Sequence, residues 1–212
     1  GLVLENVCVN GLINGFSTEV ARRQIVNLIG ESGSGKSTLL AVIARLRDPD
    51  DRAVHLNGND LRRVSVAALR RKVGIASAAT PLMRGSISMN LRYREPAASP
   101  DAIANVTAVC NLAPMLDRLS DGDRTRLSDG APELAIGEAQ RLAIARAMLG
   151  EPRVLILDDV DTHLDALTAA SIAAALRNYS GIVLMAATSP ALREIATVTW
   201  RLSDGVVTVM PP

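Results

Sequence analysis

Residues 30–38 read Gly30-Glu31-Ser32-Gly33-Ser34-Gly35-Lys36-Ser37-Thr38. This stretch matches the pattern G-x-x-x-x-G-K-[ST], in which a glycine-rich turn binds phosphate groups. It follows an apolar run over residues 24–29 and precedes a helical pattern over residues 37–45. A strand before the turn and a helix after it form the context in which this pattern indicates a phosphate-binding loop.

The residue types of this loop suit a nucleoside triphosphate. Glycines let backbone N–H groups approach phosphate oxygens without a Cβ in the way, and the following helix points its positive end at the same anion. We therefore expect residues 30–38 to bind ATP, with the Lys36 ammonium on the outer phosphates and the Ser37 hydroxyl on Mg²⁺. The side chains of Glu31 and Ser34 are expected in solvent. The alternative is a glycine-rich turn with an incidental lysine, which is disfavoured because Lys36 and Lys72 are the only lysines among 23 basic residues.

Two adjacent acids follow the clearest central strand that the sequence predicts. Val154–Leu157 reads as a buried strand, and Asp158 and Asp159 follow it directly. Ligands of α/β proteins bind at the carboxyl ends of such strands. We expect Asp158 to hold Mg²⁺ through water and Asp159 to orient an attacking water. The alternative is that the two acids only cap the next helix.

Apolar runs alternate with helical patterns along the chain, which predicts an α/β fold with a mainly parallel sheet. Residues 182–186 form another buried run, and residues 2–9 with 15–20 read as a small antiparallel sheet edge. Residues 81–147 read as an inserted helical lobe, in which Ser99 can cap a helix that begins at Pro100. We expect one domain over 1–212, with a core over 1–80 and 148–212.

Composition narrows the class of protein. Apolar residues make up 48% of the chain and its net charge is +1, so no basic field favours nucleic acid. No apolar run approaches the ~18 residues that cross a bilayer, and we expect a soluble chain with Cys8 and Cys110 reduced and buried. A start at Gly1 inside an apparent strand suggests that a preceding segment has been removed.

The run over 134–147 is Leu134-Ala135-Ile136-Gly137-Glu138-Ala139-Gln140-Arg141-Leu142-Ala143-Ile144-Ala145-Arg146-Ala147. It resembles the signature helix of ATP-binding cassette (ABC) proteins, which usually reads L-S-x-G-[QE] and then R-Q-R-x-x-[IL]-A-R-A. Three further segments are similar to family motifs in the expected order: Val73–Gly85 to the Q-loop, Thr162–Asp165 to the D-loop and Met185–Pro190 to the switch region.

This resemblance implies a P-loop NTPase (RecA-like) core, ATP and Mg²⁺ as ligands, and a head-to-tail dimer. Each ATP would lie between the phosphate loop of one chain and the signature of its partner. Ala135 and Gly137 would then contact the partner's nucleotide.

Several positions depart from the family pattern. The Q-loop Gln is replaced by Ala78, the signature Ser by Ala135, the catalytic Glu by Asp159 and the switch His by Thr188, while Asn10 stands where an aromatic residue stacks on adenine. A carboxylate shorter by one methylene and a missing histidine weaken catalysis, because misplacements of about 1 Å can cost ~10²-fold in rate. We expect ATP binding to persist and hydrolysis, at Asp159 and Thr188, to be slow.

The resemblance is to exporters in particular, because Gly122–Glu133 is similar to the loop that exporters place before the signature. We expect an ATP-driven export motor on the cytoplasmic face of the membrane, with a transmembrane domain fused upstream. The second ABC domain of the dimer is either an identical chain or a different one. One alternative is a nucleotide-binding regulatory protein with little catalysis. Another is a non-transport cassette protein acting on nucleic acid or ribosomes, which the near-neutral charge disfavours.

Overall fold

A six-stranded sheet forms the centre of the molecule in this computed structural model, which describes residues 1–9, 11–48 and 51–211. The strand order is β12 (Val206–Met210), β11 (Val198–Ser203), β3 (Ile25–Ile29), β10 (Ile182–Ala186), β9 (Val154–Asp158) and β6 (Val73–Ala76). All neighbours are parallel except β11 and β12, which form a hairpin at one edge. Strand β10 is apolar throughout, and β9 is apolar up to its last residue, Asp158, because both faces of the sheet are covered.

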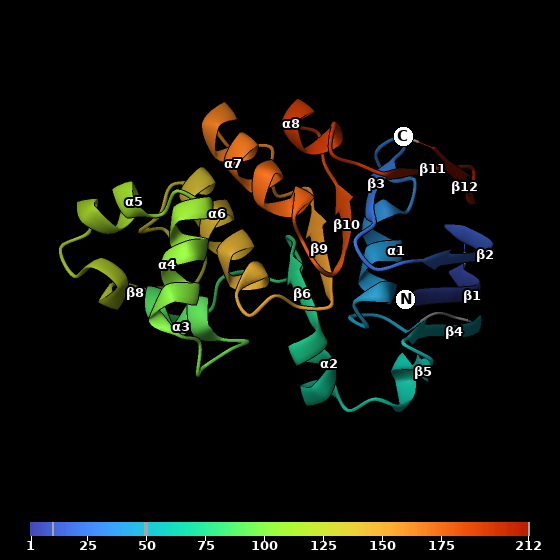
Figure 1. The fold of residues 1–212 in the computed structure, drawn as a ribbon, viewed down its shortest axis with the longest axis horizontal. Helices are drawn as coiled ribbons and strands as arrows, with labels where there is room; N and C mark the ends of the chain where they lie inside the picture. The colour runs from blue at the N-terminus through green and yellow to red at the C-terminus, as the bar shows by residue number, and fades with distance from the viewer. Residues whose placement is uncertain (10, 49–50, 212) are drawn as a thin grey trace.

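A second sheet packs beside the first and is antiparallel, as the sequence predicts. It contains β2 (Ile13–Val20), β1 (Leu2–Val9), β4 (Asp51–Leu56) and β5 (Asn59–Asp60), in that order. Helix α1 (Lys36–Ile43) shares one apolar core with both sheets (Figure 1). Phe16 and Trp200 join the sheets, since their rings meet edge to face with centroids 5.0 Å apart. Both are buried.

The segment after β6 is mostly helical and extends away from the core (Figure 1). Ser99 caps α4 (Pro100–Val109) by accepting a hydrogen bond from the backbone N–H of Ala102 at 3.2 Å, which confirms the predicted cap. A two-stranded ribbon within this segment has no counterpart in the sequence prediction. The segment contains β7 (Gly85–Ser86), α3 (Ile87–Arg92), α4 (Pro100–Val109), α5 (Ala113–Arg118), η2 (Gly122–Arg124), β8 (Arg126–Leu127) and α6 (Ile136–Met148).

The remaining helices flank the sheet. They are η1 (Leu61–Arg63), α2 (Val66–Lys72), α7 (Ala166–Arg177) and α8 (Pro190–Arg193). Cys110 is fully buried as expected, but Cys8 is only partly buried because it lies on β1 between two buried neighbours. Within the described part of the chain, no helix combines the length and the apolarity that a membrane span requires.

Candidate nucleotide-binding site

The loop between β3 and α1 borders an open cavity of about 680 Å³. Gly33 and Gly35 have φ angles of 81° and 101°, a left-handed backbone that favours glycine. Gly30 is needed for a different reason, because a Cβ there would lie 2.4 Å from the carbonyl oxygen of Leu202. These glycines let the chain turn tightly from the strand into the helix.

The loop presents backbone donors to the cavity. Within the described residues, the amides of Gly33, Gly35 and Lys36 have no hydrogen-bond acceptor, whereas Ser34 donates to the carbonyl oxygen of Glu31 at 3.2 Å. The Lys36 ammonium donates to the carbonyl oxygens of Gly30 and Glu31, both at 2.8 Å. Free amides around a lysine at a helix N-terminus form an anion site, so the loop fits a triphosphate.

The position of Ser34 differs from the expectation that its side chain lies in solvent. Its hydroxyl oxygen is buried and has no partner among the described residues, so the side chain does not lie in solvent. The cause is the tight turn, which places this hydroxyl against Gly30, 2.7 Å from where a Cβ would stand. Glu31 is exposed, as expected. The Ser34 hydroxyl therefore packs within the turn and does not line the cavity.

Ser37 and Asp158 meet at the end of the cavity. The Ser37 hydroxyl donates to Oδ1 of Asp158 at 2.9 Å, although 121 residues separate them in the chain. Burial raises the pKa of Asp158 above its usual value, and the nearby Asp159 raises it further, while the Ser37 hydrogen bond and Lys36 act in the opposite direction. A divalent cation would offset this cost of burying charge, and a hydroxyl with a carboxylate suits Mg²⁺.

Asp159 and Thr188 line the same cavity as the loop. Asp159 is exposed, has a φ of 51°, and its backbone N–H donates to the carbonyl oxygen of Ala186 at 3.2 Å. Thr188 follows β10 and faces the cavity from the neighbouring strand end. The parallel order of β9 and β10 therefore brings both residues to the phosphate loop.

Asp161 is a residue that the sequence analysis missed. It is 4% exposed, and its Oδ2 accepts hydrogen bonds from the backbone N–H groups of Thr188 at 2.8 Å and Ser189 at 2.6 Å. This carboxylate fixes the turn that carries Thr188. Its only signal in the sequence is a third acid after Asp158 and Asp159. Leu12 and Arg193 also line the cavity and carried no signal.

Ala135 and Gly137 lie outside this cavity, at the start of α6. Ala135 is the N-cap of α6, and its methyl side chain has no oxygen that could accept from the first amides of the helix. The Glu138 carboxylate accepts a hydrogen bond from the backbone N–H of Ala135 at 2.8 Å. Gly137 packs on the D-loop, where a Cβ would lie 2.6 Å from the carbonyl oxygen of His163. Ala78 is exposed and does not line the cavity, and Asn10 lies outside the described residues.

Comparison with protein families agrees with this geometry. The family model described as ABC transporter matches residues 13–162, which include the loop, the start of α6 and the Asp158–Asp159 pair. The chain belongs to the ABC transporter family. The α/β P-loop NTPase fold predicted from the sequence is thereby confirmed.

Relatives of this ABC domain include exporters. ABC transporter I family member 17 of Arabidopsis thaliana is 32% identical over 207 residues, which cover 95% of this chain and 76% of the relative. ABC transporter B family member 3 of Dictyostelium discoideum is 34% identical over 155 residues, or 73% of this chain, but the match spans only 11% of the relative. The solved structure of a bacterial Atm1-family ABC exporter with ATP bound has a TM-score of 0.84 at 27% identity and covers 98% of this chain and 37% of that one.

The chain therefore has the fold of the nucleotide-binding domain of exporter-type ABC transporters, and ABC domains are ATPases that bind ATP.

Proposed function

We propose that this ABC domain binds Mg-ATP at residues 30–38 and powers membrane export. The observation that carries the proposal is the loop itself, whose free amides and Lys36 border an open cavity beside Ser37 and Asp158. Its membrane partner is a transmembrane domain fused upstream, and the domain acts at the cytoplasmic face of the membrane. Membership in the ABC transporter family supports this assignment.

Different residues of the cavity bind the phosphates, hold the metal and orient the attacking water. The loop amides and Lys36 bind the β- and γ-phosphates, and Ser37 and Asp158 hold the metal. Mg²⁺, when bound, neutralises charge on the phosphates. Asp159 lies where it can orient a water against the γ-phosphate, and Thr188 offers a hydroxyl from the neighbouring strand end. Asp161 holds the Thr188 turn in place.

Hydrolysis is slow because Asp159 and Thr188 are poorer groups than those they replace. The Asp159 carboxylate is one methylene shorter than a glutamate, and a misplacement of about 1 Å can cost ~10²-fold in rate. Thr188 cannot carry a positive charge, and its hydroxyl lies 3.5 Å from both carboxylate oxygens of Asp161. ATP binding does not depend on either group.

The second half of each site comes from another ABC domain. Ala135 and Gly137 lie at the N-terminus of the 13-residue α6, away from the cavity of their own chain, and Ile136 between them is 64% exposed. A head-to-tail dimer would place this helix end over the partner's phosphates. A homodimer would repeat the Asp159, Thr188 and Ala135 substitutions in both sites, so a different ABC domain with intact residues is the favoured partner.

Titration of the chain with Mg-ATP in a calorimeter tests nucleotide binding. Lys36→Ala should weaken binding by about 10- to 100-fold, since a charge-assisted hydrogen bond is worth ~1.5–3 kcal/mol. Lys72→Ala is the matched control, because Lys72 is the only other lysine and lies on α2. Equal affinity of parent and Lys36→Ala would contradict the proposal.

A measurement of turnover distinguishes the export motor from a regulatory domain, a second candidate that the substitutions at Asp159 and Thr188 favour. The double variant Asp159→Glu/Thr188→His should raise phosphate release by at least about tenfold if the site is a weakened ATPase. Binding of Mg-ATP without any gain in turnover would instead support the regulatory function.

A further inference from the structure

A second cation lines the nucleotide cavity, far along the chain from the phosphate loop. Arg193 is the last residue of α8 and lines this cavity together with Lys36 and Asp159. No other charged side chain is among the described residues that line it. The motifs of the sequence analysis do not include Arg193, so its place in the cavity is a finding of the structure.

The turn that leads from β10 into α8 is held by two buried side chains. Asn27 is 3% exposed, and its Oδ1 accepts a hydrogen bond from the backbone N–H of Ala187 at 3.1 Å. The Asp161 carboxylate accepts from the next two backbone amides, those of Thr188 and Ser189. Three consecutive amides are therefore bound before a ligand arrives, and the start of α8 is fixed.

Helix α8 is anchored at its other end as well. The backbone N–H of Arg193 donates to the carbonyl oxygen of Ser189 at 3.0 Å. Leu192 is 1% exposed and packs into the apolar core that α7 shares. Arg193 itself is exposed. A buried leucine thus fixes the backbone, and the adjacent guanidinium stays accessible at the edge of the cavity.

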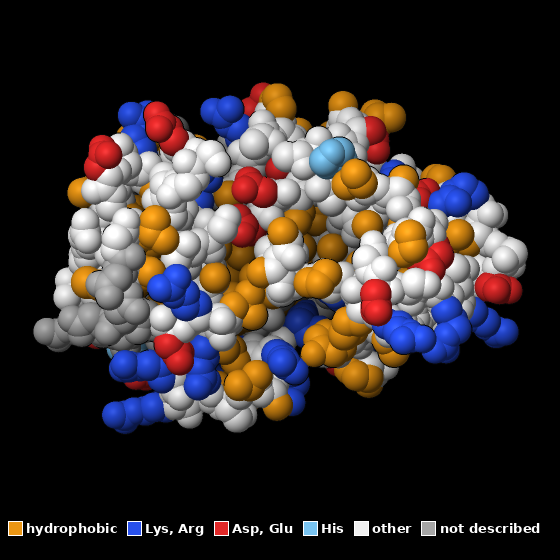
Figure 2. Space-filling view, turned by 180° about the vertical axis from the view of Figure 1, so that it is seen from behind, with side chains coloured by type: hydrophobic (Ala, Val, Ile, Leu, Met, Phe, Trp, Pro, Cys, Tyr) orange, Lys and Arg blue, Asp and Glu red, His pale blue; other side chains and the backbone are white. Residues whose placement is uncertain are grey.

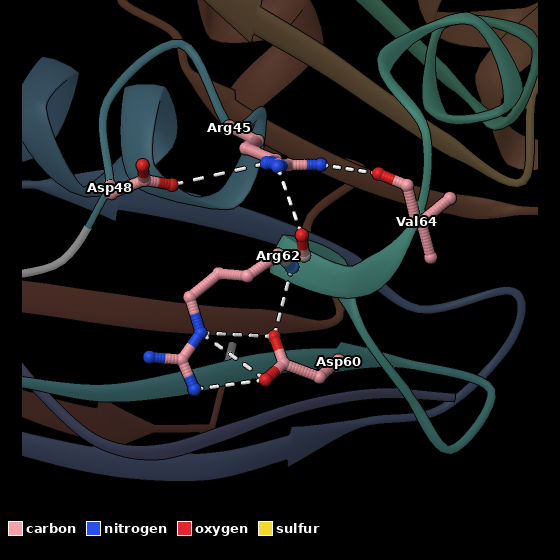
Figure 3. A network of polar contacts seen from close by, with 5 residues as sticks. All are labelled: Arg45, Asp48, Asp60, Arg62 and Val64. Atoms are coloured by element: carbon pink, nitrogen blue, oxygen red, sulfur yellow. Dashed lines mark hydrogen bonds and ion pairs between the residues drawn. The ribbon is translucent and has the colours of Figure 1, made fainter.

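The guanidinium of Arg193 is not neutralised by an acid of the described structure. Figure 3 shows the contrasting case of Arg62, which pairs with Asp60 at 2.8 Å. Arg193 forms no ion pair within the described part of the chain, either with Asp159 in the same cavity or with the adjacent Glu194. Its charge is therefore free to attract an anion that enters the cavity.

The positive charge of Arg193 is also local. Helix α8 lies at the top of the molecule in Figure 1, whereas most basic side chains of the rear face lie in its lower half in Figure 2. The whole chain is nearly neutral, with 23 basic and 22 acidic residues. No general basic field would therefore replace the charge of Arg193 if it were removed.

We propose that Arg193 binds the γ-phosphate of ATP and supplies there the positive charge that Thr188 lacks. Helix α8 follows Thr188 directly, so Arg193 reaches the cavity from the end of β10, whereas the loop amides reach it from the turn between β3 and α1. The inference rests on the proposed nucleotide binding at residues 30–38 and adds to it a residue that distinguishes ATP from ADP.

The chemistry of the side chain fits this role. A guanidinium stays charged in proteins, and its five N–H donors match phosphate oxygens in a bidentate fork. It has no lone pair with which to accept a proton from an attacking water. Arg193 therefore strengthens the binding of ATP without restoring fast hydrolysis, in agreement with the slow turnover proposed for Asp159 and Thr188.

Calorimetric titration of the full chain with two nucleotides tests the assignment. Mg-ADP lacks the γ-phosphate, whereas the magnesium complex of adenylyl imidodiphosphate (AMP-PNP) carries one that is not hydrolysed. Arg193→Gln should weaken AMP-PNP binding about tenfold and ADP binding by less than about twofold, because a charge-assisted hydrogen bond is lost with the longer nucleotide alone. Arg193→Lys keeps the charge without the fork, and its AMP-PNP affinity should lie between those of the parent and Arg193→Gln.

Arg177→Gln is the matched control. Arg177 is an exposed arginine at the end of α7 and does not line the cavity, so this variant should bind both nucleotides as the parent does. Equal weakening of ADP and AMP-PNP binding by Arg193→Gln would overturn the inference, because Arg193 would then act on the part that the two nucleotides share. Unchanged AMP-PNP affinity of Arg193→Gln would overturn it as well.

Titration of the parent and of Lys36→Ala with Mg-ADP distinguishes this inference from the proposed function. ADP binding that depends on Lys36, without a selective loss of AMP-PNP binding in Arg193→Gln, removes only the inference about Arg193. Absent binding of both nucleotides by the parent removes the proposed function, and the inference with it.

Discussion

Replacing Asp161 by Asn tests whether a buried carboxylate holds the Thr188 turn. Its Oδ2 accepts two backbone N–H groups, at 2.8 and 2.6 Å. The Asn carbonyl oxygen can accept both, so the change removes charge and leaves shape. A hydrogen bond to a charged group contributes ~1.5–3 kcal/mol and a neutral one ~0.5–1.5. The loss of about 1 kcal/mol per bond totals ~2 kcal/mol, or a Tm about 4–8 °C lower for a chain of this size.

Calorimetric unfolding of the nucleotide-free chain measures this shift. Asp159→Asn is the matched control, because Asp159 is exposed and its carboxylate has no hydrogen-bond partner among the described residues; its Tm should change by no more than about 2 °C. A Tm for Asp161→Asn equal to or above that of the parent would refute the reasoning. It would mean that removing the buried charge from water costs more than its two hydrogen bonds return.

Other substitutions follow from the same contacts. Asp158→Asn should raise the Tm without nucleotide, because burial raises the pKa of Asp158, and abolish stabilisation by Mg-ATP in a thermal-shift assay. The hydrogen bonds from Arg62 hold the pKa of Asp60 at about 2, so the Asp60–Arg62 pair stabilises the fold above pH ~4 and this stabilisation is lost as the pH falls toward 2. Urea unfolding across that range should show that the stability of Asp60→Asn depends less on pH than that of the parent. An equal pH dependence of the two proteins would count against the pairing. Tyr179→Phe removes a buried hydrogen bond to the Pro152 carbonyl oxygen, 2.6 Å long, and should lower the Tm by about 2–4 °C; an unchanged Tm would show that the bond contributes nothing net.

The sequence predicts the core of the fold because its signals are local. Glycine spacing in residues 30–38 and the apolar runs at β9 and β10 each follow from a few neighbouring residues, and the structure places these elements where those signals do. Asp158 and Asp159 are predictable for the same reason, since acids at the end of a buried parallel strand must lie at the ligand edge of the sheet.

Asp161 and the side chain of Ser34 escaped prediction because their roles depend on other parts of the chain. Asp161 is buried only because the turn after β10, 27 residues later, folds onto it. The Ser34 hydroxyl oxygen loses contact with solvent because the loop closes on Gly30. Arg45, Arg70, Arg94 and Arg146 line one hollow of the surface although they are spread over residues 45–146, so no window of sequence brings them together.

Gly137 leaves α6 no space to slide over the D-loop, since even a methyl group there would stand 2.6 Å from the carbonyl oxygen of His163. The D-loop begins three residues after Asp159, at Thr162. Displacement of the cavity edge must therefore carry the start of α6 with it. Arg146 lies nine residues along α6 from Gly137, about 14 Å away, so a tilt of this helix would also move Arg146 and the Pro81 carbonyl oxygen that it binds. The close packing of Gly137 on the D-loop thus links the edge of the nucleotide cavity to the far end of α6.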